Sequence, residues 1–87
     1  MKTVLFACVH NAGRSQMAAA LFNELADPAK AHAVSAGTDP ARAVHSEVVT
    51  VMREEGIDLT SIVPQALTDD LASRATLLIT MGCGDGC

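Results

Sequence analysis

The chain has 87 residues, 49% of them hydrophobic and 18% charged, which indicates a folded globular protein of at most one domain. Six basic residues stand against ten acidic ones, a net charge of −4, which argues against a nucleic-acid partner because a phosphate backbone requires a basic face. No segment approaches the roughly 18 consecutive apolar residues of a membrane span, and the N-terminal apolar run is too short for a signal peptide, so we expect a cytoplasmic protein with no membrane partner.

The first half of the chain alternates strand and helix patterns. Residues 2–7 form a short apolar run rich in strand formers, and polar and glycine residues after it indicate a loop. The spacing of Met17, Leu21 and Leu25 then predicts a helix over residues 14–26. An Asp-Pro pair directly after this stretch ends it, since proline disfavours a helical residue before it.

The second half continues the alternation. Residues 32–36 form a weak strand, and a second helix is expected over residues 43–55, ended by Gly56. Four apolar side chains should share one face of that helix: Val44, Val48, Val51 and Met52. Thr68, followed by two aspartates, is expected to cap a short helix, and residues 76–81 form a third, fully apolar strand.

This order predicts an α/β fold in three layers, with helices on both faces of a parallel sheet. The near-continuous apolar runs of the first and third strands suit a sheet that is covered on both sides. The working site of such a fold lies at the carboxyl ends of the strands. Cys8 follows the first strand and Cys83 the third, so the two sulfurs should share one rim if those strands are neighbours.

The loop between the first strand and the first helix has the composition of an anion cradle. Its backbone N–H groups and the helix dipole can converge on one point, and Arg14 adds a guanidinium fork matched to an oxyanion. Cys8, at the centre of these donors, is expected to be a thiolate nucleophile held by a hydrogen bond from Ser15. The oxyanion-binding residues are then Val9, His10, Asn11, Ala12, Gly13, Arg14 and Ser15. The plainer alternative makes Cys8 a small buried residue and Arg14 a surface side chain.

Other polar residues receive structural interpretations. His10 should point outward, because the cradle works through backbone groups, and Asn11 should brace the loop through its own backbone. Cys83 and Cys87 have the spacing of half a metal site, but no second pair of ligands follows and we expect no metal. The remaining histidines, His32 and His45, are expected at the surface or at helix ends.

Two segments together carry a family resemblance. Residues 4–22, VLFACVHNAGRSQMAAALF, resemble the phosphate-binding loop and first helix of the low-molecular-weight protein tyrosine phosphatase fold, and in particular its arsenate reductases. The SAGT sequence at residues 35–38 resembles the segment after their second strand, and residues 79–87, ITMGCGDGC, resemble their redox segment.

The resemblance implies reduction of arsenate to arsenite without a bound cofactor. It makes Cys8 the nucleophile, Arg14 an oxyanion ligand, Cys83 the second thiol and Cys87 the third. In this scheme Cys83 forms a disulfide with Cys8 as arsenite leaves, and Cys87 takes that disulfide over. Thioredoxin or another thiol system then supplies the electrons.

The resemblance also implies that residues 1–87 are one phosphatase-like domain that is incomplete at its C-terminus. Family members continue with a fourth strand, an Asp-Pro loop that carries a general acid, and a final helix. Without these elements the apolar third strand should be left exposed. Asp39-Pro40 has the dipeptide but follows the second strand, so the acid role is not assigned to it. Two other functions remain open: a phosphatase, and an oxyanion- or arsenite-binding protein without turnover.

Overall fold

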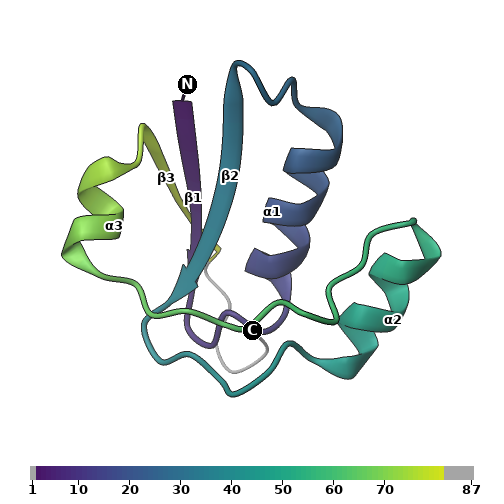
Figure 1. Cartoon of the computed structure of the whole chain (residues 1–87). Helices are drawn as coiled ribbons and strands as arrows, with labels where there is room; N and C mark the ends of the chain where they lie inside the picture. Colours follow the sequence, from purple (N-terminus) through teal and green to yellow (C-terminus); the bar gives the residue numbers. More distant parts are fainter. Residues whose placement is uncertain (1, 82–87) are drawn as a thin grey trace.

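The computed structural model describes residues 2–81 and contains a parallel three-stranded sheet (Figure 1). The strands are β1 (Lys2–Cys8), β2 (Ala31–Gly37) and β3 (Leu77–Thr80), in the spatial order β2-β1-β3. The helices are α1 (Arg14–Leu25), α2 (Ser46–Glu54) and α3 (Asp69–Arg74). The predicted order of elements is therefore confirmed, with boundaries shifted by a few residues.

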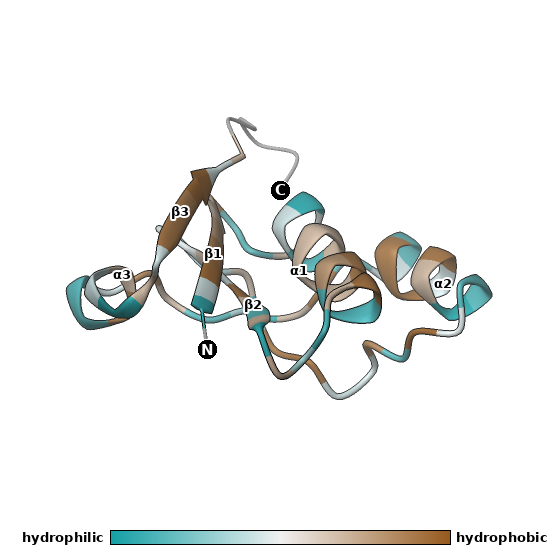
Figure 2. Ribbon diagram, turned by 90° about the horizontal axis from the view of Figure 1, so that it is seen from above, coloured by the Kyte–Doolittle hydropathy of each residue, from teal (hydrophilic) through white to brown (hydrophobic). Residues whose placement is uncertain are grey.

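The sheet lies between α1 on one face and α3 on the other, which confirms the three-layer α/β class (Figure 2). Val4 of β1 and Ala33 of β2 pack against Ala19 of α1, with Phe6 and Phe22 at the edge of this cluster. The side chains that alternate with these in the strands point to the other face of the sheet, where α3 lies. The helix α2 adds a second cluster beside α1, built around its buried side chains Val48 and Met52.

The register of the strands fixes where the site can form. Cys8 is the last residue of β1 and pairs with Gly37, the last residue of β2. On the other side of β1, Ala7 pairs with Thr80, and the N–H of Met81 donates to the carbonyl of Ala7. The first and third strands are therefore neighbours, which was the condition for Cys8 and the segment after the third strand to share one rim, and the chain leaves β3 beside Cys8.

The buried face of α1 does not consist of the leucines whose spacing predicted the helix. Leu21 is 42% exposed and Leu25 is 86% exposed, whereas Ser15, Gln16 and Ala19 are the buried residues of this helix. Small side chains face the sheet because the helix lies close to it. The leucine spacing therefore correctly predicted a helix, although Leu21 and Leu25 do not form its buried side.

The second helix begins three residues later than predicted, at Ser46. The N–H of His45 donates to the carbonyl of Ala12, and His45 has a ψ of 136°, outside the helical region, so the helix begins only after it. Val44 is nevertheless buried, but Val51 is 49% exposed and does not belong to the core face.

Gly56 ends α2 as predicted. It has a φ of 79° and donates to Arg53, while the N–H of Ile57 donates to Met52. These two bonds form a Schellman motif, in which a left-handed residue is required and glycine is favoured.

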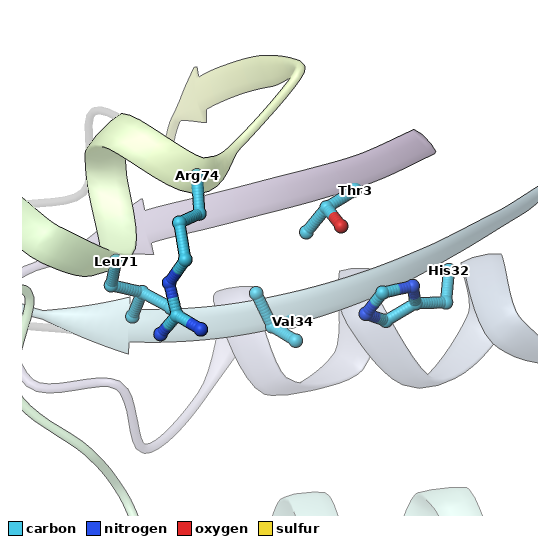
Figure 3. A pocket seen from close by; sticks show the side chains of 5 residues that line it. All are labelled: Thr3, His32, Val34, Leu71 and Arg74. Carbon is cyan, nitrogen blue, oxygen red and sulfur yellow. The ribbon is translucent and has the colours of Figure 1, made fainter. Parts of the chain in front are cut away.

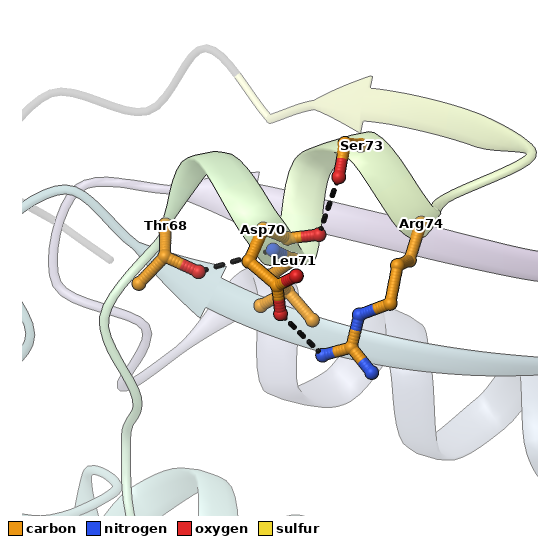
Figure 4. Close-up of polar contacts among 5 residues, drawn as sticks. All are labelled: Thr68, Asp70, Leu71, Ser73 and Arg74. Atoms are coloured by element: carbon orange, nitrogen blue, oxygen red, sulfur yellow. Dashed lines mark hydrogen bonds and ion pairs between the residues drawn. The ribbon is translucent and has the colours of Figure 1, made fainter.

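The cap of α3 is also confirmed (Figure 4). The Oγ1 of Thr68 accepts a hydrogen bond from the N–H of Leu71 at 3.1 Å. Asp70 in the first turn forms an ion pair with Arg74 in the last turn at 3.0 Å. Both side chains of the pair are largely exposed, so the cap contributes more to the stability of this helix than the ion pair does.

The third strand is at the edge of the sheet and is not covered on both sides. Leu77 is 53% exposed and Leu78 is 45% exposed, so residues 2–81 do not cover both faces of this apolar strand. Among residues 2–81, no helix combines the length and the apolar character that crossing a bilayer requires.

Candidate active site

The carbonyl groups of the loop after β1 all accept hydrogen bonds from outside the ring that they form. Each residue from Cys8 to Gly13 contributes one such carbonyl. Their donors, in order, are the N–H groups of Thr38, Asp39 and Ala41, the Nε2 of Gln16, and the N–H groups of His45 and Met17. The segment after β2 and the start of α1 thus hold this loop from the outside.

This arrangement determines where the loop N–H groups face. In a planar trans peptide the N–H points away from the preceding C=O, and the described chain contains no cis peptide. With six consecutive carbonyls bound on the outside, the N–H groups of residues 9–14 face the inside of the loop. One of them, on Asn11, donates to the Sγ of Cys8 at 3.1 Å.

Asn11 is the residue at which the loop reverses direction. It has a φ of 52°, the one positive value at a non-glycine residue in the described chain, and it is fully buried. Asparagine tolerates this conformation better than most residues because its short side chain can bond locally. Its Nδ2 donates to the Oγ of Ser15 at 2.8 Å, so Asn11 braces the loop through a contact between side chains. The sequence had suggested a bond to its own backbone instead.

The sulfur of Cys8 is buried and lies in a polar environment. Ser15 Oγ lies 2.8 Å from Cys8 Sγ, which confirms the predicted contact. Ser15 is itself fully buried and belongs to the first turn of α1. Hydrogen bonds donated to a sulfur stabilise its thiolate form, the form that acts as a nucleophile.

The N-terminus of α1 is open to an anion. Its N-cap is Gly13, which offers no side-chain hydrogen bond, and the first turn contains no acidic residue. The first N–H groups of a helix have no intrahelical partner and lie at the positive end of its dipole. Arg14 is the first residue of this helix and is exposed, so its guanidinium can reach an anion over the loop.

His10 lies on the outside of the loop, as predicted. Its Nδ1 is 3.0 Å from the carbonyl oxygen of Asp39, which belongs to the segment that binds the loop carbonyls. A carbonyl only accepts, so Nδ1 carries the proton in this contact. The imidazole therefore fastens this outer segment to the loop.

Gly37 allows the loop and the end of β2 to approach closely. A Cβ at this position would collide with the carbonyl oxygen of Val9 and lie 3.0 Å from Asn11. Glycine is needed here for space, and not for a left-handed conformation.

Sequence reasoning missed two glutamines of the site. Gln16 Nε2 donates to both the carbonyl and the Oδ1 of Asn11, each at 3.0 Å. The main-chain N–H of Gln65 donates to the same Oδ1 at 2.9 Å, and its side chain donates to the carbonyl of Ser35. The position of Gln16 one turn after the loop was a usable signal, whereas Gln65 is 54 residues from Asn11 and carried none.

The structure brings together the predicted loop residues but does not test the two later cysteines, since Cys83 and Cys87 lie outside the described residues. Met81, the last described residue, packs against Cys8. No group of three or more potential metal ligands occurs within residues 2–81.

A separate hollow of about 410 Å3 lies on the α3 side of the sheet (Figure 3). It is lined by Thr3, His32, Val34, Leu71 and Arg74. Thr3 and His32 pair near the amino ends of their strands, so this hollow is remote from Cys8 at the carboxyl end of β1. His32 is half-buried here, and His45 is the N-cap residue of α2.

A parallel α/β fold with a cysteine thiol inside a ring of backbone donors, at the start of a helix, has the geometry expected of a thiol nucleophile beside an oxyanion site. The model of the family described as low molecular weight phosphotyrosine protein phosphatase matches residues 3–85, and the chain belongs to that family.

Relatives of the chain include both reductases and phosphatases. A putative arsenate reductase of Halobacterium salinarum is 42% identical over 84 residues, which cover 90% of this chain and 58% of the relative. A probable low molecular weight protein-tyrosine-phosphatase of Ralstonia solanacearum is 33% identical over 82 residues, which cover 94% of this chain and 57% of the phosphatase. The solved thioredoxin-dependent arsenate reductase of Corynebacterium glutamicum superposes with a TM-score of 0.86 at 44% identity, over 100% of this chain and 45% of the reductase. The chain thus spans less than two thirds of these relatives.

Proposed function

We propose that the protein reduces arsenate to arsenite, with Cys8 as the nucleophile and thioredoxin or another thiol system as the reductant. The observation that carries this proposal is the ring of outward-bonded carbonyls, which leaves the N–H groups of residues 9–14 facing the inside of the loop, where the N–H of Asn11 contacts the sulfur of Cys8. Such a ring fits a tetrahedral oxyanion, and Arg14 supplies the charge that the acidic chain as a whole lacks. The similarity to arsenate reductases favours arsenate as that oxyanion.

The first step is attack of the Cys8 thiolate on arsenic. A sulfur–arsenic bond forms and one oxygen leaves arsenic as water after protonation. The loop N–H groups and the guanidinium of Arg14 bind the remaining oxygens and stabilise their negative charge. Ser15 and the N–H of Asn11 hold the sulfur in place for the attack.

The second step transfers two electrons to arsenic. Cys83 attacks the sulfur of Cys8, a disulfide forms between them, and the electron pair of the sulfur–arsenic bond remains on arsenic as arsenite leaves. Support for Cys83 comes from Met81, which packs against Cys8, because two further residues span at most about 7 Å. Cys87 then attacks Cys83, which frees Cys8 as a thiolate and leaves a Cys83–Cys87 disulfide for the reductant.

The test is arsenate-dependent turnover coupled to thioredoxin and its reductase. We expect Cys8→Ser to have no activity, and Cys83→Ser to bind one arsenic per chain without releasing arsenite. Cys87→Ser should complete one turnover and then stop with a Cys8–Cys83 disulfide, visible by mass spectrometry. Full multiple turnover by Cys83→Ser would contradict the relay.

Phosphatase activity is the second candidate, because the same loop fits phosphate and the family contains phosphatases. It would need a general acid for the leaving group, and the structure shows no carboxylate bonded at the inner side of the loop within residues 2–81. Hydrolysis of an aryl phosphate at a rate above arsenate reduction, unaffected by Cys83→Ser, would favour it. Tight arsenate or arsenite binding without product would instead indicate a binding protein.

The proposed setting is the cytoplasm. Three cysteines in a chain this short suit a thiol relay that is recharged in a reducing compartment. The proposed substrate is a free inorganic anion, and thioredoxin or a similar protein is the one macromolecular partner that the relay requires.

A further inference from the structure

The side-chain amide of Asn11 can be oriented without ambiguity. Its Oδ1 accepts from the main-chain N–H of Gln65 at 2.9 Å, and a main-chain N–H can only donate. The same Oδ1 accepts from Gln16 Nε2 at 3.0 Å. Gln16 is oriented in turn by the carbonyl of Asn11, which only accepts, at 3.0 Å from the same Nε2. Two fixed donors therefore identify this atom as the oxygen, and the atom nearest Ser15 as the nitrogen.

This orientation sets the direction of the contact between Ser15 and Cys8. Asn11 Nδ2 donates to Ser15 Oγ at 2.8 Å, so that oxygen is an acceptor on this side. A hydroxyl has one proton, and the other close neighbour of this fully buried oxygen is Cys8 Sγ at 2.8 Å. The Ser15 hydroxyl therefore donates to the sulfur. Together with the N–H of Asn11, the sulfur accepts two hydrogen bonds, as a thiolate does.

The opposite orientation of the amide would favour the unreactive form. With the oxygen of Asn11 toward Ser15, the hydroxyl would donate to Asn11 and present a lone pair to Cys8. The sulfur would then complete the contact as an S–H donor, which is a neutral thiol. The two orientations of one buried amide thus correspond to a thiolate and a thiol at Cys8.

We infer that Gln16 and Gln65 are positioning residues for the nucleophile: they hold the Asn11 amide in the orientation that directs the Ser15 hydroxyl to the sulfur of Cys8. Gln65 acts through its main-chain N–H alone, because its side chain donates to the carbonyl of Ser35 at 2.7 Å and makes no hydrogen bond to Asn11. Its carbonyl also accepts from Gly37 at 2.9 Å. A loop distant in sequence therefore sets the reactivity of Cys8.

The experiment measures the rate of Cys8 alkylation by iodoacetamide as a function of pH, in a Cys83→Ser/Cys87→Ser background in which Cys8 is the one thiol of the chain. Gln16→Met keeps the shape of the side chain and removes its donor. Gln65→Pro removes the main-chain N–H, whereas Gln65→Ala keeps it and serves as the matched control. Melting curves establish that each variant is folded.

We expect Gln16→Met and Gln65→Pro to raise the pH of half-maximal alkylation by about half a unit to one unit each, the size of one lost hydrogen bond. Gln65→Ala should move it by less than about 0.3 unit, on the same scale. A wild-type pH profile in folded Gln16→Met would overturn the inference, and so would an equal shift in Gln65→Ala and Gln65→Pro.

A second measurement does not depend on a proline substitution being tolerated. In the 15N spectrum of the Cys83→Ser/Cys87→Ser protein, which carries no substitution in the loop, the signals of the Gln65 N–H and of the Asn11 side-chain amide should shift with pH. The midpoint of these shifts should be that of Cys8 alkylation. Both titrations should disappear in Cys8→Ser, and their persistence there would contradict the inference. The inference rests on Cys8 being the nucleophile of the proposed function, but neither measurement uses arsenate, so failure of the reductase proposal would be seen separately in the turnover assay.

Discussion

The hydroxyl oxygen of Ser15 lies 2.8 Å from the sulfur of Cys8, and both residues are buried. The two residues belong to different elements, since Cys8 ends β1 and Ser15 stands in the first turn of α1. Removal of water strengthens a hydrogen bond to a charged atom. The reactivity of the thiol therefore depends on a helix–strand distance that the loop between them must maintain.

Substitution of Ser15 by alanine tests this dependence. A hydrogen bond to a charged group contributes about 1.5–3 kcal/mol, so Ser15→Ala should raise the pH of half-maximal Cys8 alkylation by about 1 to 2 units. Ser15→Thr retains the hydroxyl and is the control for the loss of the group. An unchanged pH profile in a folded Ser15→Ala protein would show that the hydroxyl does not act on the sulfur.

The lack of a side chain at Gly37 gives a second prediction. In Gly37→Ala the new Cβ meets the carbonyl of Val9, so the loop must shift or the protein must lose about 1–3 kcal/mol of stability. We expect oxyanion binding, measured with phosphate by calorimetry, to fall together with the melting temperature. Gly56→Ala is the matched control: nothing lies within 4 Å of its Cβ, and its cost of about 1 kcal/mol arises from the positive φ alone. It should melt earlier and bind phosphate normally.

Arg14 is predicted to determine oxyanion affinity. Loss of its charge-assisted bonds in Arg14→Gln should weaken phosphate binding roughly ten- to a hundredfold, and Arg14→Lys should restore only part of the affinity because lysine lacks the fork. Arg53→Gln, in the last turn of α2, changes the net charge equally and should leave binding unchanged. Equal losses in Arg14→Gln and Arg53→Gln would mean that overall charge, and not the guanidinium at the loop, attracts the anion.

Asp58 supplies a prediction on pH. The hydroxyl of Thr60 and then its main-chain N–H donate to this carboxylate and lower the pKa of Asp58 below its usual value. Because the folded pKa lies below the unfolded one, the stabilisation is present above the unfolded value and is lost as the pH falls through the folded value. Thr60→Val should raise the pKa of Asp58 in a carbon-13 titration of its carboxyl, whereas Thr60→Ser should not. No difference between the two variants would exclude the hydroxyl as the cause.

The parts of the fold that local chemistry determines were predictable from the sequence. Gly56 and Thr68 act within four residues of themselves, so their roles as helix caps followed from the residue type and its neighbours. The loop from Cys8 to Gly13 was recognised for the same reason, since a strand, a glycine and a helix start occur in immediate succession.

The parts that depend on tertiary contacts were not predictable. Leu25 has ideal helical spacing but is exposed, because the approach of α1 to the sheet is determined by small residues such as Ala19. The late start of α2 depends on a hydrogen bond from His45 to Ala12, between segments 33 residues apart. Likewise, Gln65 could be found only once the fold had brought its N–H to Asn11.

The outward bonding of the loop carbonyls limits how this motif can be transplanted. Four of the six carbonyls from Cys8 to Gly13 depend on residues beyond α1, namely Thr38, Asp39, Ala41 and His45, while Gln16 and Met17 of α1 serve the other two. A peptide carrying residues 8–17 alone would leave those four carbonyls to water, and its N–H groups would lose their common direction. The conformation of the loop therefore depends on the segments around it. Grafting the loop onto another scaffold would also require the end of β2 and the segment that leads from it to α2.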